Sequence, residues 1–147
     1  MGMREDIIKA AERVYETLGP GHEEVIYREA MSVELQERGY LVKTEMPVSV
    51  AYETSGGKRI IVGNAKVDLY VEKAGERAIL ELKTVSPLIK EKKSKEKEEI
   101  KEYRQLMKYL ESLQEKNGYL INFPFPPKDK PEIISTKEEE IDAQNTA

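Results

Sequence analysis

Residues 67–83 read VDLYVEKAGERAILELK, in which two largely apolar segments flank a short turn. Alternating apolar and polar residues predict a strand on each side, and Ala74-Gly75 predicts a tight hairpin turn between them. A turn centred on these two residues pairs the strands so that partner numbers add up to 149, the sum of 74 and 75. One face of the predicted hairpin is then wholly apolar and holds the pairs Val67 with Leu82, Leu69 with Leu80, and Val71 with Ala78.

The same register predicts that two carboxylates face each other on the other side of the hairpin, because Asp68 pairs with Glu81. Directly opposed side chains have Cβ atoms about 4.5–5.5 Å apart, and like charges at that range are destabilising. Two such carboxylates require a cation or a shared proton. Mg²⁺ suits the first case, since it binds hard oxygen ligands, usually one or two carboxylates together with water and substrate phosphate.

Lys83 follows Glu81 by two residues and therefore projects from the same face of its strand. Its ammonium group could orient an attacking water or stabilise negative charge on a phosphorane. The alternative is an ordinary surface hairpin, because Glu and Lys often alternate on solvated strands. Tyr70 and Ile79 favour the catalytic interpretation, since they make this face partly apolar and indicate a sheet covered on both sides.

The hairpin lies within a longer succession of helices and strands. Gly19-Pro20-Gly21 separates two amphipathic helices, and Ser55-Gly56-Gly57 predicts a further turn. The expected elements are helices at 4–18 and 22–38, a strand at 41–52 that resumes at 59–62 after this turn, strands at 67–71 and 78–83, a helix at 100–113, a strand at 119–123, and a short last strand near Ile133-Ile134. The side chains expected to point inward from the second helix are Val25, Ile26, Ala30, Val33 and Leu35. This order predicts an α/β fold, α-α-β-β-β-α-β, with a mixed β-sheet flanked by helices.

The chain has 147 residues, which suits one domain over residues 1–136 and an acidic, flexible tail at 137–147. The absence of Cys excludes disulfides and thiolate sites, and the single His22 argues against histidine-rich metal sites. No apolar run approaches about 18 residues and the N-terminus lacks a signal-peptide core, so we expect a cytoplasmic protein without a membrane span. Abundant Glu and Lys also resemble the composition of thermophile proteins.

The charge distribution bears on the class of partner. The net charge is −4, whereas dedicated nucleic-acid-binding domains are more often basic. A carboxylate cluster lowers the total, however, and a local basic patch can still hold phosphates. Residues 90–99 are mostly Lys and Glu, and form either a solvated segment or a phosphate-binding segment beside the site. The solvated segment is the favoured interpretation, because Lys–Glu mixtures are typical of exposed helices.

The hairpin belongs to a set of five motifs that follow one another in a fixed order. They are G-x-x-E-x-x-Y at Gly21, Glu24 and Tyr27, VDL at 67–69, ELK at 81–83, QLMKYL at 105–110 and GYLINF at 118–123. Together, over roughly residues 5–123, they resemble the GxxExxY family of the PD-(D/E)XK nuclease superfamily. The resemblance implies a restriction-endonuclease-like PD-(D/E)XK core.

The resemblance also implies a set of site residues. Asp68 and Glu81 would bind Mg²⁺ or Mn²⁺, with the main-chain carbonyl of Leu82 nearby. Lys83 would be the catalytic lysine, and Glu24 would add a carboxylate that binds metal or positions water.

Gln105, with Tyr109 one helical turn later, would support this site from the third predicted helix. The chain departs from the family pattern in a longer link at residues 90–99, and in Glu102, which stands where the family often has His. These departures bear on substrate handling more than on the metal site.

The expected function is a metal-dependent nuclease that hydrolyses phosphodiester bonds of DNA, with RNA as the other substrate class. The alternative is a non-catalytic nucleic-acid-binding or protein-interaction module on the same fold. A homodimer is compatible with cleavage of two strands, although nothing in the sequence requires one.

Overall fold

The computed structural model describes residues 2–89, 97 and 100–137. Its helices are α1 (Met3–Leu18), α2 (Glu24–Glu37) and α3 (Lys101–Leu113), and its strands are β1 (Leu41–Glu53), β2 (Arg59–Lys73), β3 (Glu76–Lys83), β4 (Gly118–Asn122) and β5 (Glu132–Ser135). The predicted order is confirmed, and the short last strand is β5, but residues 59–62 do not continue the strand at 41–52 as predicted; they form one strand, β2, with residues 67–71. Most of the Lys/Glu-rich run and the tail from residue 138 lie outside the described residues.

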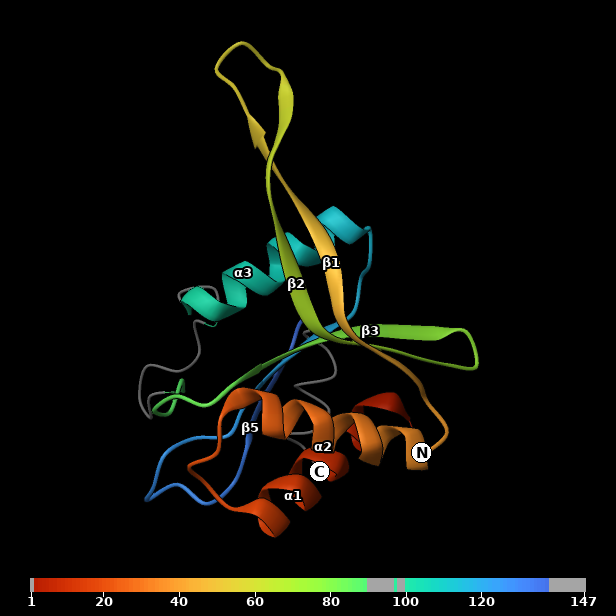
Figure 1. The fold of residues 1–147 in the computed structure, drawn as a ribbon, viewed down its shortest axis with the longest axis vertical. Helices are drawn as coiled ribbons and strands as arrows, with labels where there is room; N and C mark the ends of the chain where they lie inside the picture. Colours follow the sequence, from red (N-terminus) through yellow and green to blue (C-terminus); the bar gives the residue numbers. More distant parts are fainter. Residues whose placement is uncertain (1, 90–96, 98–99, 138–147) are drawn as a thin grey trace.

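The five strands form one mixed sheet in the order β1-β2-β3-β4-β5. Neighbouring strands are antiparallel except β3 and β4, which are parallel and are connected through α3. Helices α1 and α2 cover one face of the sheet, and α3 covers the other (Figure 1). Tyr70 and Ile79 are buried against α3, so the sheet is covered on both sides where β2 meets β3, as predicted. No helix within the described residues is long and apolar enough to cross a membrane.

The predicted hairpin register is confirmed over five pairs. The turn residues Ala74 and Gly75 both have positive φ, 53° and 84°, which is the backbone conformation of a tight two-residue hairpin. The paired residues are Leu69 with Leu80, Tyr70 with Ile79, Val71 with Ala78, Glu72 with Arg77, and Lys73 with Glu76. The turn thus sets which side chains of β2 and β3 share a face.

The prediction for Val67 is wrong. Val67 packs with the α3-side cluster, whereas Leu69 and Val71 pack with α1 and α2. The regular alternation is interrupted between Val67 and Leu69, where backbone pairing with β3 stops and where Glu45 of neighbouring β1 has φ 54°. The predicted register assumed an unbroken ladder through this point.

The inward face of α2 also differs from the prediction. Tyr27, Met31 and Leu35 are fully buried, at the i, i+4, i+8 spacing of one helical face, and Ala30 is partly buried. Val25, Ile26 and Val33 are exposed instead. Tyr27 decides the orientation, because its ring stacks on Phe123 at the end of β4, with ring centroids 4.4 Å apart.

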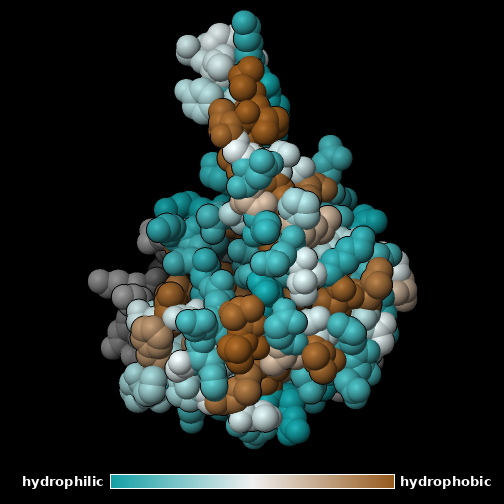
Figure 2. Space-filling view, viewed as in Figure 1, coloured by the Kyte–Doolittle hydropathy of each residue, from teal (hydrophilic) through white to brown (hydrophobic). Residues whose placement is uncertain are grey.

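Residues 50–63 of β1 and β2 form an arm that projects from the body of the protein (Figure 1). A β-bulge at Val50/Ala51 lies at its base, and hydrogen bonds between Thr54 and Lys58 close its tip. Figure 2 shows hydrophobic surface on the arm. Its exposed large apolar residues are Val50, Tyr52, Ile60, Ile61 and Val62. Beyond its base, neither strand of the arm pairs with a further strand among the residues that the structure describes.

Candidate active site

The acidic pair lies where β2 and β3 stop pairing through their backbones. The last regular pair is Leu69 with Leu80. Beyond it, the amide of Asp68 donates a hydrogen bond to Oε1 of Glu81 at 2.8 Å, and the amide of Leu82 donates to Oδ2 of Asp68 at 2.8 Å. Each carboxylate therefore takes the place of a backbone acceptor, and the two acids come together in the gap between the strands, although the regular pairing ends before the predicted pair of Asp68 with Glu81.

Burial makes this pair electrostatically costly. Glu81 is only 6% exposed, and its pKa is raised to about 8, first by burial and then by the negative charge of Asp68. The pKa of Asp68 is also raised by burial, against the opposing effects of the Leu82 amide and Lys83. Two acids in one low-dielectric site do not both ionise readily unless a positive charge joins them.

Lys83 and Glu24 belong to the same cluster. The pKa values of Glu24, Asp68 and Glu81 are all raised overall, and the positive charge of Lys83 opposes part of each rise. The pKa of Glu24, at the start of α2, is raised first by burial and then by Asp68. These mutual electrostatic effects indicate that four of the predicted site residues, from α2, β2 and β3, lie near one another.

The donor chemistry of the pair suits a hydrated divalent cation. Among the residues that the structure describes, no three His, Cys, Asp or Glu side chains form a complete metal site. Asp68 and Glu81 each use one oxygen to hold the opposite strand, and within the described part of the chain their other oxygens accept no hydrogen bond. Two protein carboxylates are enough for Mg²⁺ and similar ions, because these ions commonly bind one or two carboxylates and complete their coordination shell with water and phosphate oxygens. Coordination by Glu24 and by the carbonyl of Leu82 stays a prediction.

Of the two α3 residues singled out from the sequence, Tyr109 is near enough to the acidic pair for the charges of the pair to act on it. Its pKa is raised by burial and then by the charges of Glu81 and Asp68. Gln105 is exposed and makes no hydrogen bond with any residue in the described ranges, so its role stays a prediction.

The segment that follows Lys83 is held by two buried polar residues that sequence reasoning missed. The side chain of Asn122, which pairs with Lys83 across β3 and β4, accepts a hydrogen bond from the amide of Val85 at 3.0 Å and donates one to its carbonyl at 3.2 Å. Asn122 also donates to Glu132 at 2.8 Å, and Glu132 accepts from the amides of Leu88 and Ile89. This network fixes the exit of β3 beside the site; the only sequence signal was Asn within an apolar strand.

Arg28 and Glu45 were also missed. Arg28 lies one helical turn after Glu24, and its charge lowers the pKa of both Glu24 and Asp68. Glu45 raises the pKa of Asp68 and pairs with Arg28 at 3.3 Å. The i, i+4 spacing from Glu24 was a signal for Arg28. No sequence pattern pointed to Glu45.

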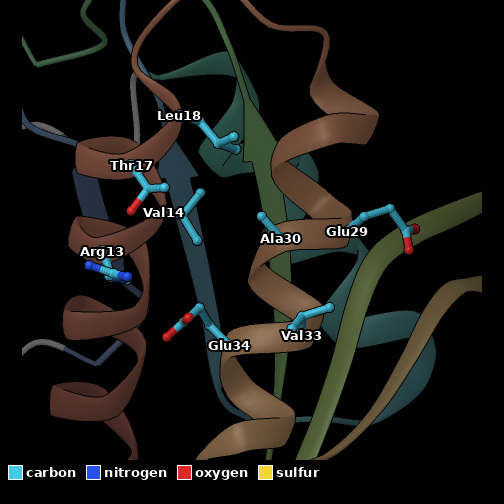
Figure 3. Close-up of a pocket in the computed structure, with 8 residues that line it drawn as sticks. All are labelled: Arg13, Val14, Thr17, Leu18, Glu29, Ala30, Val33 and Glu34. Atoms are coloured by element: carbon cyan, nitrogen blue, oxygen red, sulfur yellow. The ribbon is translucent and has the colours of Figure 1, made fainter.

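A separate hollow between α1 and α2 has a volume of about 360 Å³ (Figure 3). Its floor is apolar, with Val14, Leu18 and Ala30 pointing inward between the helices, and the exposed Val33 also lines it. None of the four clustered site residues lines it, so it is distinct from the acidic cluster.

Comparison with known proteins agrees with this geometry. The family described as the PD-(D/E)XK nuclease superfamily matches residues 2–135. A solved structure titled "Crystal structure of SSO0001" is similar with a TM-score of 0.50 and 18% sequence identity, covering 97% of this chain and 72% of that chain. At this identity the likeness concerns the fold alone. A search of curated proteins found no match. With nearly its whole length matched and its acidic pair placed between two diverging strands, the chain belongs to the PD-(D/E)XK nuclease superfamily.

Proposed function

We propose that the protein is a nuclease that hydrolyses phosphodiester bonds of DNA with Mg²⁺ or Mn²⁺ at Asp68 and Glu81. One observation carries the proposal: the buried carboxylate of Glu81 and the partly buried carboxylate of Asp68 lie together between β2 and β3, the charge of Lys83 acts on both, and the pKa of Glu81 is raised to about 8. Such a pair is stabilised by a shared proton or by a cation, and a divalent ion held by two carboxylates is left with positions for water and phosphate. Nuclease activity and divalent-metal use are general properties of the superfamily, which supports the proposal.

Each clustered residue has a role in the proposed reaction. A bound divalent cation would polarise the scissile phosphate and lower the pKa of a water ligand. Asp68 and Glu81 would hold that ion, and Lys83 stabilises the negative charge that develops on the phosphate oxygens. Glu24 orients the attacking water and accepts its proton. A new P–O bond forms as the bond to the leaving oxygen breaks, and the leaving oxygen takes a proton from solvent.

The direct test is cleavage of labelled single-stranded and double-stranded DNA and RNA with Mg²⁺, Mn²⁺ or a chelator. Lys83→Ala is expected to lower the cleavage rate by about 10²–10³-fold, the usual effect of removing one group that stabilises transition-state charge. Lys116→Ala, an exposed lysine between α3 and β4, serves as the matched control and is expected to keep the native rate.

The outcomes separate the alternatives. Native-like cleavage by Lys83→Ala contradicts the role given to this lysine. Tight binding of DNA or RNA by the native protein without metal-dependent turnover favours the non-catalytic module instead. Cleavage of RNA but not DNA keeps the site and changes the substrate class.

We further propose that a second copy of the chain pairs with the arm at residues 50–63. Cross-strand partners share a face, so Tyr52 and Ile60 lie on one face of the arm, while Ile61 lies on the other. An isolated two-stranded ribbon is marginally stable in water, and the charged residues of this arm, Glu53, Lys58 and Arg59, are confined to its tip. Apolar faces and unpaired strand edges of this kind are better suited to pairing with the arm of a second copy across a two-fold axis than to binding the phosphate backbone of a nucleic acid.

Pairing of the arms predicts the mass of the protein in solution. Light scattering during gel filtration is expected to give twice the 16.9 kDa of one chain, falling to one chain on dilution. The double variant Tyr52→Glu with Ile61→Glu places charges on both faces and is expected to be monomeric at every concentration. Val33→Glu, an exposed apolar residue on α2, is the control and should leave the mass unchanged. A native protein of 16.9 kDa throughout contradicts the pairing.

A further inference from the structure

Arg28 places a positive charge at the rim of the acidic cluster. It lies on α2 one turn after Glu24, and its charge acts on both Glu24 and Asp68. Its side chain is only 15% exposed, although it is a long cationic side chain that would ordinarily extend into water. The fold thus holds one guanidinium group beside the two carboxylates proposed to bind the metal ion.

The present partners of Arg28 are weakly held. Its Nη1 lies 3.3 Å from Oε2 of Glu45, and its Nη2 lies 3.3 Å from Oε2 of Glu29. The two glutamate side chains are 52% and 60% exposed, and solvent-screened pairs of this kind contribute little to stability. A phosphate would be a better partner, because its oxygens match the planar, two-pronged donor geometry of guanidinium.

Glu45 reaches Arg28 through an unusual backbone. Its φ of 54° lies in the left-handed region, which is uncommon for a residue other than Gly and is often found at functional sites. This residue interrupts the pairing of β1 with β2 between the pairs Thr44 with Leu69 and Met46 with Val67, and so stands opposite Asp68. A carboxylate in this position occupies the guanidinium group and also adds negative charge next to the site.

We propose that Arg28 binds a phosphate of the nucleic-acid substrate next to the scissile one, and that Glu45 occupies Arg28 until that phosphate displaces it. This inference rests on the proposed nuclease function and adds a substrate-binding residue and a competing carboxylate to it. The charge of Arg28 contributes to substrate affinity, whereas Lys83 and the acidic pair carry the chemical step.

A purely structural role for the pair makes a different prediction. If Arg28 and Glu45 only join α2 to β1, removal of either partner lowers the melting temperature by a similar amount and leaves substrate affinity unchanged. If Glu45 competes with substrate, removing Arg28 weakens binding and removing Glu45 strengthens it. The two variants therefore separate the roles by the sign of their effects on KM.

The experiment compares native protein, Arg28→Ala, Arg28→Lys and Glu45→Gln in steady-state cleavage of a DNA duplex. Arg28→Ala is expected to raise KM about tenfold with kcat little changed, as expected for loss of one charge-assisted phosphate contact. Arg28→Lys should recover part of this loss, and Glu45→Gln should lower KM severalfold. Arg13→Ala, an exposed arginine on α1, is the matched control and should keep the native KM.

Binding measured without turnover completes the test. In a Glu81→Gln background, anisotropy of a labelled duplex should show that Arg28→Ala lowers the slope of log affinity against log salt by about 0.9, the value for one lost phosphate contact. Two outcomes overturn the role of Arg28 while the proposed function stands, provided that the native protein cleaves DNA. One is an unchanged KM and an unchanged salt slope in Arg28→Ala. The other is a raised KM in Glu45→Gln. Absence of any cleavage by the native protein overturns the proposed function itself.

Discussion

Replacement of Glu81 by Gln is expected to abolish metal-dependent cleavage while leaving the folded structure in place. Gln has nearly the shape of Glu and keeps an oxygen that can accept the 2.8 Å hydrogen bond from the amide of Asp68. It removes one of the two charges that would hold the metal ion. The cleavage rate should fall by at least about 10³-fold, since loss of a single stabilising group at a reaction centre already costs 10²–10³-fold.

The same substitution is expected to stabilise the metal-free protein at alkaline pH. Glu81 is buried next to Asp68, so its ionisation opposes folding when no cation is bound. The measurements are cleavage with Mg²⁺ or Mn²⁺ and thermal unfolding in a chelator. Glu76→Gln is the matched control, because Glu76 begins the same strand but is exposed, and both its activity and its stability should be native. Native-like cleavage by Glu81→Gln would refute this site.

The hairpin at the centre of the site was predictable because two local signals agree. The apolar face of residues 69–71 and 78–80 and the Ala74-Gly75 turn specify the same register, and five of its pairs are present. The error at Val67 came from the site itself. Asp68 and Glu81 there take over the hydrogen bonds of the backbone ladder, so that the strands part and the period-2 alternation no longer holds.

The remaining errors arise from contacts between segments distant in the chain. Apolar residues surround most of α2, and the buried face is chosen by stacking of Tyr27 on Phe123, almost a hundred residues later. Arg28 and Glu45 meet only once α2 packs against β1, and the left-handed conformation of Glu45 has no signature in a Glu residue. The acidic pair could therefore be derived from local pattern, whereas the contact between Arg28 and Glu45 could not.

The metal-free protein is expected to lose stability as pH rises from about 5 to about 8. The pKa of Glu81 is 4.5 in an ordinary environment and about 8 in the folded protein, so the folded state holds a proton that the unfolded state releases. Below pH 4.5 the Glu81 carboxyl is protonated in both the folded and the unfolded protein, so it does not change the free energy of unfolding. Between pH 4.5 and pH 8 its ionisation in the unfolded chain favours unfolding, and above pH 8 the loss of stability reaches its full size. The shift corresponds to at most about 5 kcal/mol at 1.36 kcal/mol per pKa unit.

A divalent cation should reverse this loss, because it binds the ionised pair and therefore stabilises only the folded state. Thermal unfolding measured from pH 5 to pH 9 should show a falling melting temperature in chelator and a much flatter profile in Mn²⁺ or Mg²⁺, so that the gain from metal grows with pH. Glu81→Gln should flatten the chelator profile and remove most of the metal effect, whereas Glu76→Gln should reproduce both native curves. Parallel native curves with and without metal, at every pH, would mean that the buried acids hold no cation, and the two carboxylates would then serve only to close the gap between β2 and β3.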